Sequence, residues 1–223
     1  MMRRVARWHL WLGWVVAVPL LLWTASGLFM VARSIEDVRG EALRAEPPAI
    51  SSVGLTAPQS AAPLKTLKLV LQRGAPVWVA ETPDGQGGRF DGRTGASLTS
   101  VSSAEAQALA RAALRSPGAI VGLERFAADA PPVDLRKKRP SWRVRFDNGL
   151  HVYIDAETGE TLAVRSRLWR WYDIAWGLHI MDPVAREDTS HPLLIGSAAL
   201  SLVAVGLGAA LLFRRRRRSV APV

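Results

Sequence analysis

Two long apolar segments enclose a more polar middle region. No Asp, Glu, Lys or Arg interrupts residues 8–32 or residues 189–213. A helix needs about 20 apolar residues to cross a bilayer, so each segment is long enough. We therefore predict transmembrane helices at 10–32 and 193–213, with a kink at Pro19 in the first.

Arginine flanks both apolar segments on their outer sides. The protein has a formal net charge of +10, from 29 Lys and Arg against 19 Asp and Glu. Eight of the cations lie in the two tails: Arg3, Arg4, Arg7, Arg214, Arg215, Arg216, Arg217 and Arg218. The rest of the chain carries 21 − 19 = +2, so nucleic acid is not expected as a partner. Arginine beside a span stays in the cytoplasm, which predicts cytoplasmic tails and an exported middle region.

A cleaved signal peptide is the alternative for the first segment. Its apolar core is longer than that of a typical signal peptide, and no clean Ala-x-Ala site follows. Trp8, Trp11 and Trp14 next to the arginines are typical of a membrane interface. We predict an uncleaved anchor.

Small residues recur along both predicted spans. One helical stripe contains His9, Gly13, Val16, Leu20, Thr24 and Gly27. In the second span, Gly206 and Ala210 form a small-xxx-small pair. Such residues allow close helix packing. We expect the two spans to pack on each other or on a second copy, which makes the bilayer and either a membrane protein or a homodimer the expected partners.

The middle region contains an internal repeat with an offset of 64 residues. Pro76-x-Trp78 recurs as Pro140-x-Trp142, and Asp84-Gly85 recurs as Asn148-Gly149. Phe90-Asp91-x-x-Thr94-Gly95-x-x-Leu98 recurs as Ile154-Asp155-x-x-Thr158-Gly159-x-x-Leu162. Asp-Gly and Asn-Gly favour tight hairpins, so the pattern predicts a duplicated antiparallel meander.

Polar and apolar residues alternate in the second copy of this meander. Trp142, Val144 and Phe146 predict a buried sheet face, with His151, Tyr153 and Asp155 on an exposed one. Residues 104–115 predict a helix, capped by Ser102 or Ser103, that packs on the buried face. The expected fold class is α+β. The predicted segments are an N-terminal tail 1–9, a span 10–32, a linker 33–63, a domain 64–168 with repeats at about 64–100 and 104–166, an interfacial helix 169–182, a span 193–213 and a basic tail 214–223.

The interfacial helix carries the most suggestive histidine. On a helix, Tyr172, Trp176 and His179 share one face. The ordinary interpretation is an aromatic belt at the membrane surface with a solvated or capped histidine. The alternative is a haem or metal ligand.

Four histidines limit where a haem could bind. His9 lies at the cytoplasmic end of the first span, and His179 and His191 precede the second. A membrane thickness of about 30 Å separates the two ends, so His9 and His179 cannot hold one iron from opposite sides. A bis-histidine haem would use His179 with His191, or one histidine from each of two protomers. The candidate cofactor residues are His9, His179, Tyr172 and Trp176; no other metal site is expected.

The sequence shows no familiar catalytic motif. His-Glu-x-x-His, Walker, Gly-x-Gly-x-x-Gly and Gly-x-Ser-x-Gly patterns are absent, and the chain has no cysteine. One basic patch could attract an anion such as a siderophore carboxylate or lipid phosphate; it consists of Arg136, Lys137, Lys138, Arg139, Arg143 and Arg145. The alternative is a solvated strand edge. We therefore expect no enzyme.

Three stretches together resemble a known family. RWHLWLGW, the two hairpins ending in Asp-x-x-Thr-Gly-x-x-Leu, and WGLHIMD before the last span resemble a PepSY-associated transmembrane protein. The resemblance implies a bacterial inner-membrane protein with periplasmic PepSY domains. Larger relatives with more spans take part in siderophore-iron uptake and reduction, some with b-type haem. Isolated PepSY modules occur in protease propeptides.

Three functions therefore compete. The leading hypothesis is a non-enzymatic, membrane-anchored binding or accessory protein in iron or siderophore uptake, with no cofactor. The second is electron transfer through haem b bound by His9 or His179. The third is regulation of a periplasmic peptidase by strand addition at the exposed sheet.

Overall fold

The chain forms two compact units, which we call the membrane unit and the sheet unit. A computed structural model describes the backbone of residues 2–60 and 62–219 and the side chains of residues 3–60 and 62–213. The membrane unit combines the chain up to Ser34 with the chain from Trp171 onward, and the sheet unit is Ile35–Arg170. Each unit is built from elements that the apolar pattern anticipates.

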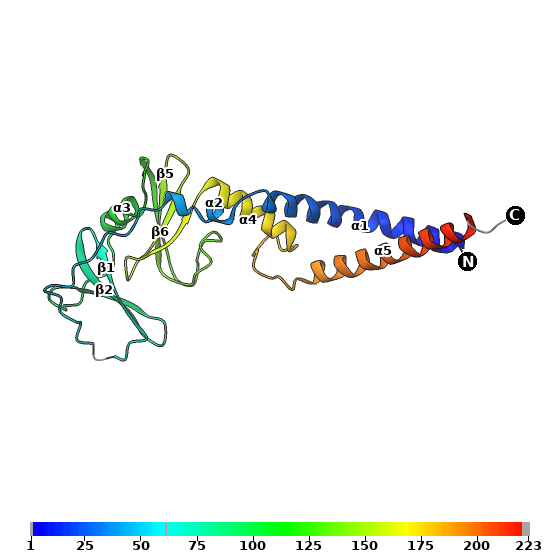
Figure 1. Cartoon of the computed structure of the whole chain (residues 1–223). Helices are drawn as coiled ribbons and strands as arrows, with labels where there is room; N and C mark the ends of the chain where they lie inside the picture. The colour runs from blue at the N-terminus through cyan, green and yellow to red at the C-terminus, as the bar shows by residue number, and fades with distance from the viewer. Residues whose placement is uncertain (1, 61, 220–223) are drawn as a thin grey trace. The chain divides into compact units, whose positions relative to one another are not determined.

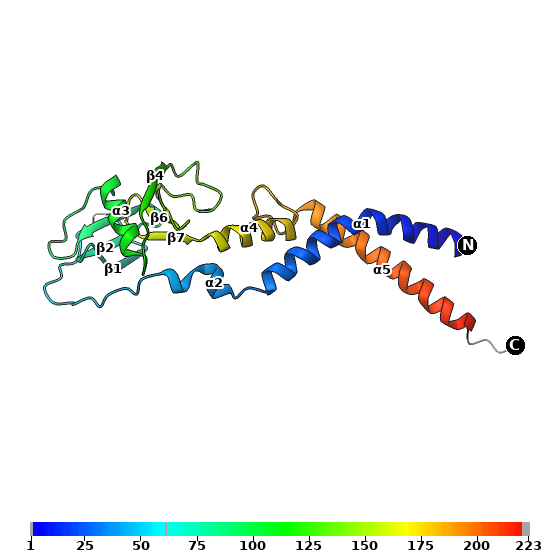
Figure 2. The same cartoon turned by 90° about the horizontal axis from the view of Figure 1, so that it is seen from above.

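Two long helices dominate the membrane unit. Helices α1 (Met2–Val31) and α5 (Pro192–Ser219) run antiparallel and cross (Figures 1 and 2). Figure 2 also shows α1 changing direction along its length, and Pro19 lies inside that helix. Helix α4 (Arg167–His179) enters this unit from the sheet unit.

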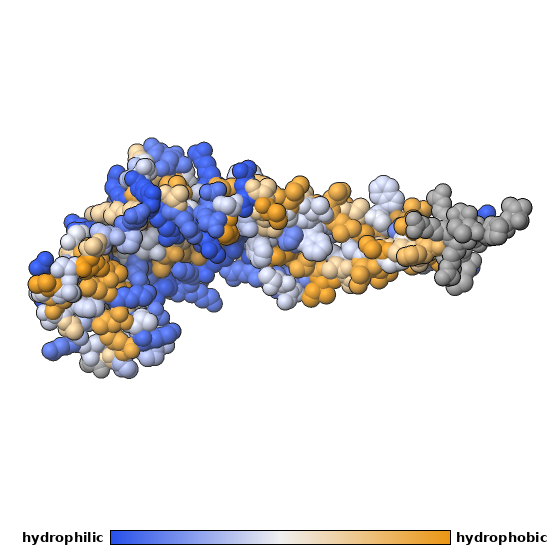
Figure 3. Space-filling view, viewed as in Figure 1, coloured by the Kyte–Doolittle hydropathy of each residue, from blue (hydrophilic) through white to orange (hydrophobic). Residues whose placement is uncertain are grey.

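The long helices expose apolar side chains over most of their length (Figure 3). Trp14 is 81% exposed and Val31 is 85% exposed. Both helices are long and apolar enough to cross a membrane. A water-soluble protein rarely leaves so large an apolar surface uncovered, whereas lipid covers it at no cost. The predicted fold class, two membrane helices flanking a sheet-rich α+β region, is confirmed.

The sheet unit contains two antiparallel sheets. The first has the order β1 (Thr66–Gln72), β2 (Ala75–Glu81), β3 (Gly87–Asp91). The second has the order β4 (Ile120–Phe126), β5 (Ser141–Phe146), β6 (His151–Asp155), β7 (Thr161–Arg165). Helix α3 (Ser103–Ala112) connects them, and α2 (Ile35–Arg39) and the 3-10 turn η1 (Glu41–Leu43) precede them.

The duplication is visible in the strand register. Trp78 pairs with Phe90 in the first sheet, and Trp142 pairs with Ile154 in the second, each shifted by the predicted 64 residues. The turn after each hairpin is also repeated. Asp155 Oδ1 accepts the amides of residues 157 and 158, just as Asp91 Oδ1 accepts those of residues 93 and 94. The repeated sequence therefore produces a repeated backbone.

The two copies differ in the helix that precedes the hairpin. In the second copy, α3 packs on Val144, Val152 and Ile154, and the side chain of Ser102 accepts the Glu105 amide as its N-cap. The 64-residue offset does not extend to the first strand, because β4 begins 54 residues after β1. The stretch before β1 contains Pro47, Pro48 and Pro58, and proline interrupts a helix. Among the described residues of the sheet unit, only the short α2 and η1 form ahead of β1, and the first sheet has no long helix of its own.

The predicted exposed face of the second sheet is wrong. Tyr153 is fully buried and Asp155 is 1% exposed, while His151 is half-buried. Residues 127–140, between β4 and β5, fold over this face and bury Leu135 against Tyr153. Strand alternation identifies the two faces of a sheet, but it does not reveal a loop that covers the more polar one.

Candidate functional site

His9 joins the two spans within the membrane unit. Its Nδ1 lies 3.0 Å from the carbonyl oxygen of Ala204. Since a carbonyl only accepts, Nδ1 carries the proton, and a neutral ring then keeps its lone pair on Nε2. A Cβ on Gly208 would lie 2.9 Å from His9 Cε1, so glycine makes room for the imidazole. The predicted stripe is correct here, since Val16 on the same face is buried.

The small residues of α5 that meet α1 are not the predicted pair. Gly206 and Ala210 are exposed, whereas Ala204 and Gly208 face His9. A groove of about 460 Å³ runs beside the histidine. Its walls are formed by Gly13, Val16, Ala17, Leu20, Leu21, Ser201, Ala204 and Val205. The packing of His9 on α5 needs small residues at positions 204 and 208. The pairs Ala204–Gly208 and Gly206–Ala210 both match a small-xxx-small pattern, so the sequence does not distinguish them.

His179 makes a second contact of the same kind, between α4 and α1. Its Nδ1 lies 3.2 Å from the Trp23 carbonyl oxygen and 3.2 Å from Ser26 Oγ. The Ser26 hydroxyl donates to the Leu22 carbonyl oxygen at 2.7 Å, so Nδ1 is again the donor and Nε2 again keeps the lone pair. The predicted packing stripe of α1 contained Thr24, but Thr24 is exposed and Ser26 is buried. The packing face of α1 therefore lies two residues further along the helix at this point. A Cβ on Gly27 would lie 3.1 Å from the ring.

Tyr172 and Trp176 lie on α4 together with His179. Trp176 Nε1 donates to the Arg186 carbonyl oxygen at 3.1 Å, in the turn that follows the helix. The opposite side, with Trp171 and Leu178, lines a groove against α1. We predicted a helical segment through Asp182, but α4 ends at His179.

Asp182 closes the turn after α4. Its carboxylate accepts the amides of Ala185, Glu187 and Asp188. Burial of the carboxyl would raise its pKa, but these amide hydrogen bonds outweigh burial and hold the pKa of Asp182 below its usual value. Arg186 forms an ion pair with the buried Asp173 at 2.7 Å in the same turn.

The two membrane histidines lie far apart along α1. His9 belongs to α1, and His179 contacts it at residues 23–27. Seventeen residues separate positions 9 and 26, and a rise of 1.5 Å per residue gives about 26 Å. One iron cannot bind both rings of one protomer, in agreement with the sequence argument. His191 Nδ1 accepts the Leu193 amide at 3.4 Å and so caps the start of α5.

The predicted basic patch has its own carboxylates. Arg139 pairs with Asp155 and lies 3.7 Å from Glu157, and Arg143 and Arg145 both pair with Glu124. Lys137 donates to the Leu162 carbonyl oxygen, Arg136 is half-buried, and Lys138 is exposed. The patch is therefore less cationic than its sequence indicates. The predicted topology arginines Arg3, Arg4 and Arg7 belong to α1, whereas the side chains of Arg214–Arg218 lie outside the described residues.

A buried polar cluster on the second sheet has no motif in the sequence. The Tyr153 hydroxyl donates to Asp134 Oδ1 at 2.5 Å, and His151 Nδ1 lies 3.5 Å from Oδ2 of the same carboxylate. Burial would raise the pKa of Asp134, but the interactions with His151 and Tyr153 outweigh it and lower that pKa. The cluster fastens the loop 127–140 to the sheet.

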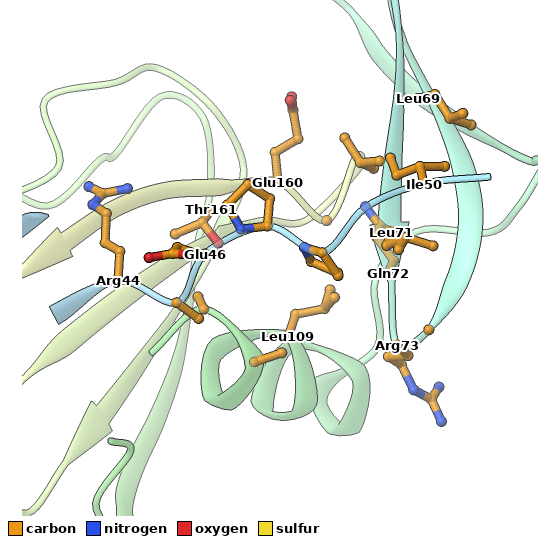
Figure 4. A pocket seen from close by; sticks show the side chains of 18 residues that line it. Arg44, Glu46, Ile50, Leu69, Leu71, Gln72, Arg73, Leu109, Glu160 and Thr161 are labelled. Carbon is orange, nitrogen blue, oxygen red and sulfur yellow. The ribbon is translucent and has the colours of Figure 1, made fainter. Parts of the chain in front are cut away.

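A cavity of about 650 Å³ lies within the sheet unit, where the first sheet meets the second repeat (Figure 4). Four elements line it: residues 44–50, the end of β1, the C-terminal half of α3, and residues 159–161 after β6. Leu109 forms part of the floor, and Ile50, Leu69 and Leu71 add apolar walls. No pattern in the sequence indicates this cavity, because its walls come from segments with no shared motif.

A buried polar network supports one side of the cavity. Arg89 makes two hydrogen bonds to the Glu105 carboxylate, at 2.6 and 2.8 Å, and one to Gln72 Oε1 at 3.1 Å. Gln72 Nε2 then donates to the Thr158 carbonyl oxygen at 2.7 Å. The hydrogen bonds from Arg89 lower the pKa of Glu105. The network fixes the first sheet against α3 and the turn after β6.

Comparison with known proteins settles the family. The family model that describes the PepSY-associated TM region matches residues 6–222. The chain belongs to the PepSY-associated transmembrane family. No curated protein and no solved structure matches it. The match includes both spans as well as the sheet unit, so the predicted resemblance is confirmed, and this family member is a membrane protein.

Proposed function

We propose that this PepSY-associated protein is a non-enzymatic, membrane-anchored binding protein of the bacterial inner membrane. Its sheet unit would face the periplasm, because the arginines next to both spans favour cytoplasmic tails. The observation that carries the proposal is the 650 Å³ cavity between the two repeats. Ligand sites commonly have this size and lie where two structural parts meet.

The biological context that we propose is iron or siderophore uptake, on the basis of family resemblance. In this context the sheet unit would hold a ligand or partner for a second membrane protein. Regulation of a peptidase stays a prediction, since it would use the same unit but a different partner.

A cavity-filling substitution tests the binding function. Ala112 lines the cavity from the exposed end of α3, and Arg111 next to it does not. In a strain that lacks the protein, we expect the wild type and Arg111→Trp to restore ferric-siderophore uptake, and Ala112→Trp to fail. Full uptake by the deletion strain would refute the iron context. Full rescue by Ala112→Trp would refute the cavity as the site.

Haem binding is the second candidate function, and one observation favours it. His9 and His179 both use Nδ1 on a backbone carbonyl and leave the Nε2 lone pair free. Axial histidines of haem proteins bind iron through one ring nitrogen while the other is fixed by a hydrogen bond. The residues present therefore fit the group, which would supply one-electron transfer. Because His9 and His179 of one protomer lie far apart along α1, they would not hold the same haem. The second histidine would come from another chain, such as a second protomer.

Absorption spectroscopy of the detergent-purified protein tests haem binding. A haem protein shows a Soret band and sharp α and β bands after dithionite reduction. We expect His9→Ala or His179→Ala to abolish them and His151→Ala, in the sheet unit, to leave them unchanged. A protein that stays colourless after expression with added haem would refute this candidate.

A further inference from the structure

The free edge of the first sheet carries a set of unpaired backbone groups. Strands β1 and β2 are joined by a two-residue turn, in which Arg73 (φ 54°) and Gly74 (φ 80°) are both left-handed. In such a hairpin the flanking residues, Gln72 and Ala75, exchange both hydrogen bonds. Every second residue of β1 from Gln72 therefore bonds to β2. Leu69 and Leu71 direct their N–H and C=O groups away from β2, toward the free edge of the sheet.

These outward groups face the cavity. Four consecutive strand residues, Leu69–Gln72, line it, and so do the turn residues Arg73 and Gly74. Successive strand residues point to opposite faces, so only a space along the strand's edge can touch all four. Among the backbone hydrogen bonds of the described residues, none joins Leu69 or Leu71 to a neighbour on this side. Edges that stay unpaired usually carry a bulge or a proline, and β1 has neither.

The size of the cavity suits a short extended peptide. One strand residue occupies about 3.4 Å along the strand, about 4.8 Å between strands and about 10 Å between layers, or roughly 160 Å³. A cavity of about 650 Å³ therefore holds about four residues of extended chain. Leu69, Leu109 and Ile50 provide apolar contacts for its side chains.

The charges around the cavity favour an anionic end on that peptide. Its two acids already have cations, since Glu46 lies 2.9 Å from Arg115 and Glu160 lies 3.6 Å from Lys68. Arg44 and Arg73 have no carboxylate within 4 Å among the described residues and lie on opposite sides of the cavity (Figure 4). Both guanidinium groups point away from the cavity in Figure 4, so an arginine would turn inward to meet a carboxylate placed at either side.

We propose that the edge of β1 binds an extended peptide of about four residues with apolar side chains and a carboxylate at one end. The peptide adds a fourth strand beside Leu69 and Leu71, and an arginine holds its carboxylate. This inference rests on the proposed binding function and names the ligand class of that cavity.

The test uses the full-length protein in detergent and a fluorescent peptide. The probe is a labelled hexapeptide of alternating Val and Thr that ends in Asp with a free carboxyl terminus, followed by anisotropy. We expect saturable binding. Leu69→Ala removes a side chain, whereas Leu69→Pro also removes the outward N–H and leaves the β1–β2 bonds intact. We expect Leu69→Pro to bind about tenfold more weakly than Leu69→Ala.

The charge contribution has a matched pair of variants. Arg73→Asn keeps a residue that tolerates the left-handed turn, and Arg93→Gln removes an exposed cation that does not line the cavity. We expect Arg73→Asn, but not Arg93→Gln, to weaken binding several-fold and to reduce its salt dependence. An amidated probe that ends in Asn should bind the wild type as weakly as the acidic probe binds Arg73→Asn.

Three outcomes separate this inference from the proposed function. Equal binding by Leu69→Pro and Leu69→Ala would refute strand addition. If a ferric hydroxamate chelate binds, Ala112→Trp blocks it, and the peptide does not bind, the peptide inference fails while the binding function stands. Decanoate serves as a third probe, an apolar chain with a carboxylate. If the peptide, the chelate and decanoate all fail to bind, both the peptide inference and the binding function are refuted.

Discussion

The buried Arg89–Glu105 pair gives the sharpest stability prediction. The Arg89 side chain is 5% exposed and the Glu105 side chain 19%, and two short hydrogen bonds join them. Glu105→Ala leaves a buried guanidinium whose remaining acceptors among the described residues are Gln72 and the Thr99 carbonyl oxygen. Removing one partner of a buried pair typically costs about 3–5 kcal/mol. We expect a loss of this size, or roughly a 100- to 4,000-fold increase in the unfolded fraction.

Pulse proteolysis of the full-length protein across a urea gradient measures this loss. Fragments from the sheet unit report its unfolding. The exposed pair Glu46–Arg115 provides the control, since its carboxylate is 86% exposed and surface pairs contribute little. The double variant Arg89→Met, Glu105→Leu should recover most of the loss, because no unpaired charge remains. If Glu105→Ala shifts the midpoint no more than Glu46→Ala, the network does not hold the first sheet in place.

Acid, glycine and tyrosine perturbations give three further predictions. Folding lowers the pKa of Glu105, so the stability that this carboxylate contributes is present above its unfolded pKa of 4.5 and is lost as pH falls through the lower folded pKa. In Glu105→Gln, the urea midpoint should therefore depend less on pH in this acidic range. Gly159→Ala should lower the urea midpoint more than Gly54→Ala. Both glycines have a left-handed backbone, where a Cβ costs about 1–2 kcal/mol of stability, but at Gly159 the Cβ would also lie 2.8 Å from Gln72 Nε2, whereas at Gly54 it meets open space. Tyr153→Phe should cost about 1–3 kcal/mol, since it leaves a buried acceptor unpaired, and unchanged proteolysis of residues 127–140 would contradict this.

Repeated and periodic features were predictable from sequence. The 64-residue offset predicted the hairpin register because backbone turns depend on local residues such as Asp155 and Gly159. Uninterrupted apolar runs predicted the two membrane spans, because the ability to cross a bilayer also depends on the residues of one local segment. The membrane contacts of His9 were partly predictable, since a small-residue stripe marks a packing face but does not choose Gly208 over Gly206.

Features that depend on distant segments were not predictable. The loop that buries Tyr153 has no periodic pattern, and its anchor Asp134 lies in no motif. The cavity depends on how residues 44–50 pass β1 and α3, and no single stretch encodes that path. Local sequence rules describe an element and its faces, whereas what covers each face is a property of the tertiary fold.

Comparison of the two repeats indicates which one provides stability and which one is free to bind. Helix α3 covers the second sheet, where Ile154 is fully buried. The equivalent Phe90, on a sheet that has lost its helix, is only half-buried. Ile154→Ala should therefore cost about 2–5 kcal/mol, and Phe90→Ala should cost less even though it removes a larger side chain. Urea midpoints of the two variants provide the comparison. An equal or larger loss for Phe90→Ala would mean that the first sheet is as tightly packed as the second, and the division of roles between the repeats would be wrong.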